Sequence, residues 1–125
     1  MLQFVFKRQI QRLGFLVEDV ADNGKAAVEK MATAQFDIVF MDVALPGMDG
    51  IEATTIIRQA EGDRRTPIVG LTAYGERQLC MNAGMDDFLQ KPVALDELSE
   101  AITKWTNAEK RAPLRDKPLD IFLAE

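Results

Sequence analysis

The chain has 125 residues, a length typical of one domain with a single hydrophobic core. Its formal net charge is -5 and it contains no basic run, which argues against a nucleic-acid partner. No apolar stretch is long enough to span a membrane and the first eight residues lack the order of a secretory signal, so we expect no membrane association and a cytoplasmic location. Cys80 is the only cysteine, which excludes an internal disulfide and a thiolate metal cluster.

Segments with helical and strand-like spacing of apolar residues alternate along the chain, which predicts an α/β fold with a parallel sheet. The expected helices cover residues 2–13, 25–33, 50–60, 76–82 and 95–105. The expected strands cover residues 15–21, 36–41, 68–72 and 87–90.

A tail follows the last of these helices. Residues 108–118 are charged, contain two prolines and show no apolar period, so we expect a linker there. The apolar run Leu119–Leu123 either docks on the domain or opens a following module. We therefore divide the chain into a domain at residues 1–107 and a tail at residues 108–125.

Three polar side chains stand at the ends of strand-like runs. The apolar run 36–41 ends in Asp42, and a turn rich in proline, glycine and aspartate follows at once. Thr72 ends the next run, and Lys91 follows the one after it. Because parallel strands end at one edge of a sheet, a carboxylate, a hydroxyl and an amine would meet there. Together they form a site suited to a phosphoryl group.

These segments, together with Gly84–Asp87 and Lys91–Pro92, resemble the response-regulator receiver domains over about residues 8–105. The segment Gly84–Asp87 is most similar to receivers of hybrid sensor kinases. The resemblance implies a flavodoxin-like doubly wound parallel sheet in three α/β/α layers. It also implies a phosphoacceptor module of a two-component or phosphorelay system, a part of a hybrid histidine kinase rather than a dedicated enzyme by itself.

The resemblance assigns a role to each candidate residue. Asp42 is the phosphoacceptor and Lys91 pairs with the phosphoryl oxygens, aimed inward in the family by a cis bond to the following proline. Thr72 is the switch hydroxyl, and Phe88 is the aromatic side chain that rotates inward when that hydroxyl moves. The chain has no histidine, so any phosphohistidine donor must lie on another module or another protein. The resemblance implies that this donor is a histidine kinase or a histidine phosphotransfer protein.

Receivers begin with an apolar strand that ends in acidic residues, whereas this chain begins at the first helix. We therefore expect an N-terminally truncated domain whose sheet lacks its first strand, the one between the second and third strands in the order 2-1-3-4-5. Each unsatisfied buried backbone group would cost about 1–3 kcal/mol. Residues 2–6 could extend into the empty position, or a second copy could supply a strand and form a homodimer through the exposed sheet edge.

The absence of the acidic pair also removes most of the expected Mg²⁺ ligands. Mg²⁺ prefers near-octahedral oxygen ligation, and the ligands that remain are the Asp42 carboxylate and the backbone carbonyl of Ala44, with the other acidic ligands absent. We expect Mg²⁺ binding to be weak or lost. A non-phosphorylatable pseudo-receiver that acts as a protein-interaction module therefore stays open as an alternative. An enzyme of haloacid-dehalogenase type is disfavoured, because Ala44 stands where that family has a second aspartate.

Overall fold

The computed structural model describes residues 5–17, 19–63, 65–73, 76–106 and 119–125. Five parallel strands form one sheet in the order β1-β5-β2-β3-β4. The strands are β1 (Asp19–Ala21), β2 (Ile38–Asp42), β3 (Ile68–Thr72), β4 (Asp87–Gln90) and β5 (Ile121–Ala124). The helices are α1 (Val5–Arg12), α2 (Gly24–Thr33), α3 (Gly50–Glu61), α4 (Arg77–Ala83) and α5 (Leu95–Thr106).

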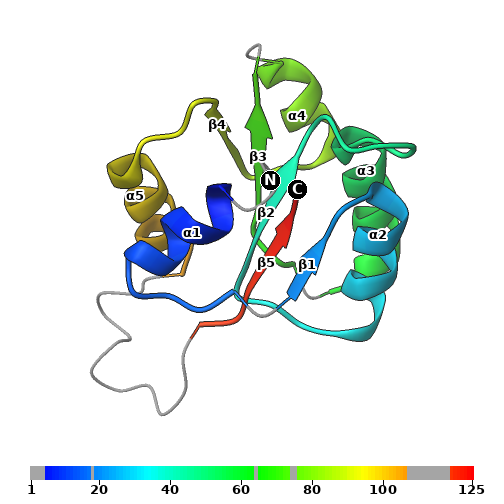
Figure 1. Cartoon of the computed structure of the whole chain (residues 1–125). Helices are drawn as coiled ribbons and strands as arrows, with labels where there is room; N and C mark the ends of the chain where they lie inside the picture. The colour runs from blue at the N-terminus through cyan, green and yellow to red at the C-terminus, as the bar shows by residue number, and fades with distance from the viewer. Residues whose placement is uncertain (1–4, 18, 64, 74–75, 107–118) are drawn as a thin grey trace.

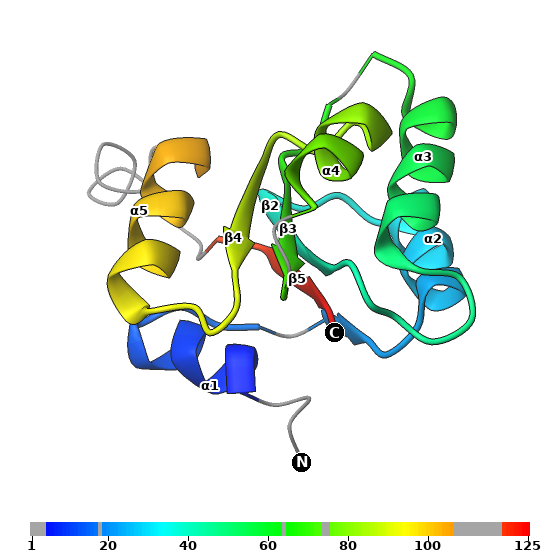
Figure 2. The same ribbon diagram turned by 90° about the horizontal axis from the view of Figure 1, so that it is seen from above.

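The helices cover both faces of the sheet and give the three-layer architecture that the sequence predicted. Helices α1 and α5 lie on one face and helices α2, α3 and α4 on the other (Figures 1 and 2). Every residue of β2, β3 and β5 is buried, as expected for parallel strands covered on both sides. Within the described residues, no helix combines the length and hydropathy that a bilayer span requires.

Local sequence signals explain where the helices begin and end. Asn23 caps α2 by accepting a hydrogen bond from the Ala26 amide at 2.8 Å, and Asp49 caps α3 in the same way. Helix α4 ends at Gly84, whose φ of +107° is a left-handed conformation that favours glycine. The five predicted helices and four predicted strands are all present, with boundaries that differ by a few residues.

The expectation that the sheet lacks its first strand is wrong. Strand β5, near the C-terminal end of the chain, occupies the position between β1 and β2 (Figure 1). It pairs in parallel with both neighbours, with Phe122 in register with Asp19 on one side and with Val39 on the other. The backbone groups that an empty position would have exposed are therefore paired, which removes the predicted cost of the gap.

Side chains fix β5 in this position. Phe122 is fully buried, and its ring stacks on Phe36 with centroids 4.8 Å apart. At the start of the segment the Asp37 amide donates to the Asp120 carbonyl at 2.8 Å, and the Asp120 amide donates to the Asp37 carboxylate at 2.8 Å. Of the two alternatives for the apolar run Leu119–Leu123, the structure shows the first, because this run docks on the domain as part of the sheet.

The proposed extension of residues 2–6 into the sheet is also wrong for the part that the structure describes. Val5 and Phe6 belong to α1, and Phe6 is buried in the core beneath that helix. The i, i+4 spacing of Phe6 and Ile10 places both side chains on the core side of the helix. Residues 2–4 and the predicted linker at 108–118 lie outside the described residues.

Candidate functional site

Asp42 ends β2 at the carboxyl edge of the sheet, with 7% of its surface exposed. Its Oδ1 accepts a hydrogen bond from the Ala44 amide at 2.9 Å, and its Oδ2 lies 2.6 Å from the Lys91 Nζ. The adjoining chain packs closely, because a Cβ at Gly50 would lie 2.1 Å from the Asp42 carbonyl oxygen. The carboxylate is therefore held in one orientation, with an amide and an ammonium group as its partners.

Lys91 reaches Asp42 from the end of β4. Its backbone amide donates to the Thr72 carbonyl at 2.7 Å, which ties the loop after β4 to the end of β3. The Lys91–Pro92 peptide bond is cis, in agreement with the resemblance. The side chain of Lys91 is 30% exposed, so its ammonium group can meet both Asp42 and a ligand from solvent.

The two predicted switch residues contact the beginning of α4. The buried Thr72 hydroxyl donates a hydrogen bond to the Glu76 carboxylate. The Arg77 guanidinium lies 5.8 Å from the centroid of the Phe88 ring, within the range of a cation–π contact. Glu76 and Arg77, two consecutive residues at the start of α4, thus contact the side chains of both predicted switch residues. The sequence predicted Thr72 and Phe88, but not the residues that hold them.

A second carboxylate lies beside Asp42. Ala124 of β5 is in register with Met41, so the next residues, Glu125 and Asp42, are neighbours at the same edge. The Glu125 amide donates to the Ala21 carbonyl at 2.9 Å, which continues the pairing with β1. Both side-chain oxygens of Glu125 are buried, and neither makes a hydrogen bond of ordinary geometry.

Burial is the main cause that raises the pKa of the Glu125 carboxyl from its ordinary value of 4.5 to about 7, and the nearby charge of Asp42 is the second. Lys91 and the Phe6 amide act in the opposite direction on this pKa, but more weakly. Glu125 was not predicted as a site residue, although the apolar run 119–124 ends close to this carboxylate much as the run 36–41 ends at Asp42.

Asp86 and Asp87, at the start of β4, make structural contacts. The Asp86 carboxylate accepts hydrogen bonds from the Ile68 amide at 2.8 Å and from Arg58 at 2.7 Å, which ties β3, α3 and the turn together. The Asp87 carboxylate accepts from the Trp105 indole at 3.1 Å. Among the described residues, no group of three or more acidic, cysteine or histidine side chains could hold a metal ion by itself.

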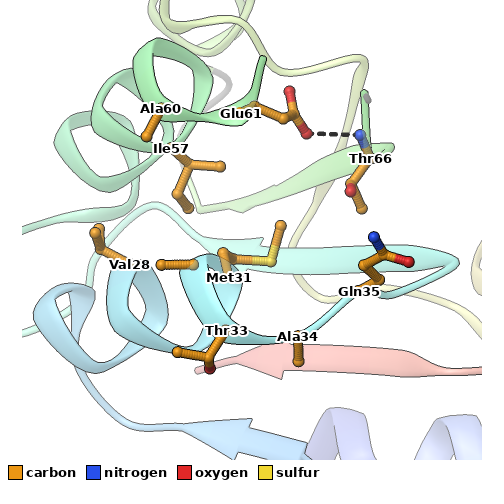
Figure 3. Close-up of a pocket in the computed structure, with 10 residues that line it drawn as sticks. Val28, Met31, Thr33, Ala34, Gln35, Ile57, Ala60, Glu61 and Thr66 are labelled. Carbon is orange, nitrogen blue, oxygen red and sulfur yellow. Dashed lines mark hydrogen bonds between the residues drawn. The ribbon is translucent and has the colours of Figure 1, made fainter. Parts of the chain in front are cut away.

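A groove of about 540 Å³ lies elsewhere, between α2 and α3 (Figure 3). Its lining includes Val28, Met31 and Ile57, and the Thr66 amide at one end donates to the Glu61 carboxylate at 2.6 Å. Thr66 precedes β3, so this groove extends to the amino edge of the sheet, opposite the edge that carries Asp42. None of the predicted site residues is among the described residues that line it.

The domain matches a known protein family over most of its length. The model of the response regulator receiver domain matches residues 1–103. The chain belongs to this family. Among curated relatives, the sensor histidine kinase GacS of Pseudomonas protegens is 44% identical over 96 residues, which are 72% of this chain and 10% of that kinase. The hybrid signal transduction protein dokA of Dictyostelium discoideum is 35% identical over 107 residues, or 85% of this chain and 6% of dokA.

Solved receivers have the same fold. The receiver domain of the sensor histidine kinase PA1611 from Pseudomonas aeruginosa, with a magnesium ion in its active-site cleft, superposes with a TM-score of 0.76 at 35% identity. The match covers 84% of this chain and 88% of that one. A complex of the Saccharomyces cerevisiae phosphotransfer protein Ypd1 with the receiver domain of the response regulator Ssk1 gives a TM-score of 0.74 at 31% identity, covering 86% and 82%. The flavodoxin-like fold and the receiver family are therefore confirmed.

Proposed function

We propose that this receiver accepts a phosphoryl group on Asp42 from a phosphohistidine. The observation that carries the proposal is the arrangement of the Asp42 carboxylate, whose Oδ2 lies 2.6 Å from the Lys91 ammonium and whose Oδ1 accepts from the Ala44 amide. A carboxylate held in this way at the edge of a sheet can act as a nucleophile toward phosphorus. Thr72 at the end of the adjacent strand supplies a hydroxyl for the transferred group.

The transfer is a simple exchange of bonds. One Asp42 oxygen forms a bond to phosphorus while the phosphorus–nitrogen bond of the donor breaks, and the leaving imidazole takes up a proton from solvent. Phosphoryl transfer requires mainly positioning and the neutralisation of charge, and Lys91 supplies one positive charge for the phosphoryl oxygens. The Thr72 hydroxyl then exchanges its bond to Glu76 for one to a phosphoryl oxygen, and Phe88 follows it inward.

Mg²⁺ is the cofactor we propose for this reaction. Oxygen ligands suit this ion, and the Asp42 carboxylate and the Ala44 carbonyl would hold it, completed by water and by the phosphoryl group. When bound it neutralises charge on the transferring group. The PA1611 receiver, which has a magnesium ion in its cleft, supports this assignment by similarity.

The partner is expected to be a histidine kinase or a histidine phosphotransfer protein, and the curated relatives support a place within a hybrid histidine kinase. Homodimer formation through an empty position in the sheet loses its physical basis, because β5 fills that position. An exchange of β5 between two copies is the form of dimer that this topology allows.

Beryllofluoride, which stands in for the phosphoryl group, provides the test. With Mg²⁺ it should raise the melting temperature and change the fluorescence of Trp105, whose indole donates to Asp87 next to Phe88. A ligand at one hundred times its dissociation constant stabilises by about 2.7 kcal/mol. Asp42→Asn should abolish both responses, whereas Asp63→Asn, at an exposed position, should preserve them. Absence of any response in the wild-type chain would favour the pseudo-receiver, a module that acts by protein interaction alone.

A further inference from the structure

Glu76 stands at the N-cap position of α4, where a side-chain oxygen can accept hydrogen bonds from the amides of the first helical turn. Its side chain makes no such capping bond. The carboxylate accepts the hydrogen bond of the Thr72 hydroxyl instead. Only four positions separate the two residues, so α4 begins directly beyond the end of β3. The carboxylate of Glu76 is therefore directed at the switch hydroxyl and not at its own helix.

This hydrogen bond competes with the one that Thr72 would make to a phosphoryl group. A threonine hydroxyl carries one hydrogen, so a bond donated to Glu76 must be given up before that hydrogen can serve a phosphoryl oxygen. Glu76 is also negatively charged, and a phosphoryl group on Asp42 would add negative charge at the end of the neighbouring strand. Glu76 must therefore withdraw from Thr72 when the site is phosphorylated.

Arg77 makes a corresponding contact with the second switch residue. Its guanidinium carbon lies 5.8 Å from the centroid of the Phe88 ring, which is half-buried, while Arg77 itself is exposed. A cation over an aromatic ring is attracted to it, so this contact favours the observed position of the ring. The ring would leave the cation behind on turning inward. The contact of Arg77 with Phe88 therefore opposes the same transition as the bond between Glu76 and Thr72.

We propose that Glu76 and Arg77 form a latch, a pair of positioning residues that holds Thr72 and Phe88 in the positions seen in this structure. Because the two residues are consecutive at the start of α4, movement of this turn releases both contacts together. The latch thus sets how tightly the site binds a phosphoryl group. This inference rests on the proposed function, because it concerns the response of the same site.

Arg77 provides the more decisive test, because its charge and its latch contact predict opposite results. Removal of a cation should by charge alone weaken the binding of an anion. The latch predicts that Arg77→Gln binds beryllofluoride in the presence of Mg²⁺ about twofold to fivefold more tightly than the wild type, as followed by Trp105 fluorescence. Arg77→Lys keeps a cation and should stay closer to the wild type. Arg8→Gln, the same change at an exposed position on α1, should not tighten binding.

Glu76→Asp tests the other half of the latch without a change of charge. Aspartate is one methylene shorter and is favoured at the N-cap, so its carboxylate should turn to the amides of α4 and release the Thr72 hydroxyl. Beryllofluoride should then bind roughly threefold or more tightly. Thermal melting of each variant shows that it is folded.

Tighter binding in both Arg77→Gln and Glu76→Asp, with Arg8→Gln unchanged, would support the latch. Wild-type affinity in both variants would overturn it, and so would weaker binding in Arg77→Gln, because Arg77 would then act through its charge. Tightening in only one of the two variants would overturn the pairing of the two residues. A wild-type chain that does not respond to beryllofluoride at all is a separate result, which refutes the proposed function and the latch with it.

Discussion

Truncation of Phe122 to alanine tests whether the C-terminal strand belongs to the core. Phe122 has no exposed surface, and its ring stacks on Phe36 at 4.8 Å. Replacing a buried phenylalanine by alanine typically costs about 3–5 kcal/mol, through lost burial and the cavity that remains. Since a domain has only about 5–15 kcal/mol of stability, this single change should remove a large fraction of it. For a chain of this size, the melting temperature should fall by roughly 10–20 °C.

Urea denaturation followed by circular dichroism measures the loss directly. Leu79→Ala is a matched control, because Leu79 is apolar but 55% exposed on α4 and should change the free energy of unfolding by no more than about 0.5 kcal/mol. If Phe122 lay in a tail outside the fold, its truncation would behave like the control. A loss of less than about 1 kcal/mol for Phe122→Ala would therefore refute the placement of β5 in the sheet.

Three further predictions concern single residues of the site. Because the folded chain keeps the Glu125 proton up to a pKa of about 7 while the unfolded chain releases it near 4.5, the free energy of unfolding should fall between these pH values. Because Glu125 is only partly buried, this fall in the free energy of unfolding should be about 1–2 kcal/mol. Denaturation at pH 5 and pH 8 should show the fall in the wild type and not in Glu125→Gln. Equal falls in the two proteins would contradict the burial of this carboxyl. Glu76→Gln should weaken the hydrogen bond that the Thr72 hydroxyl donates to residue 76 by about 1 kcal/mol, so beryllofluoride should bind roughly fivefold more tightly. A titration followed by Trp105 fluorescence measures this affinity. Unchanged binding would argue that Glu76 does not restrain the Thr72 hydroxyl. Ala44 is exposed beside Asp42, so Ala44→Glu should obstruct water and lengthen the lifetime of the phosphorylated form severalfold, as followed by its decay; an unaltered decay would remove Ala44 from this role.

The sequence predicted most of the site because each residue ends an apolar run. A parallel sheet brings the ends of its strands to one edge, so Asp42, Thr72 and Lys91 could be placed together without knowledge of the strand order. The structure contains the contact that this pattern predicts between Lys91 and Asp42, with the Lys91 Nζ 2.6 Å from the Asp42 Oδ2. The helices were equally accessible, since side-chain caps such as Asn23 and Asp49 are local signals.

The position of β5 could not be predicted in the same way. Its apolar run was recognised, but its neighbours in the sheet, β1 and β2, lie about eighty to one hundred residues earlier in the chain. Strand order in space depends on which open position can bury Phe122 and pair its backbone, and local periodicity does not encode this. The placement of Glu125 beside Asp42 was not predicted for the same reason. The contacts of Glu76 and Arg77 depend on how the start of α4 is oriented, which spacing alone does not determine.

Phosphorylation of Asp42 is tested most directly by intact-mass spectrometry after incubation with acetyl phosphate and Mg²⁺. The wild-type chain should gain the mass of one phosphoryl group, and Asp42→Asn should gain none, while Asp63→Asn should behave as the wild type. A wild-type chain that gains no mass, or an Asp42→Asn variant that gains as much as the wild type, would contradict the assignment of Asp42 as the phosphoacceptor.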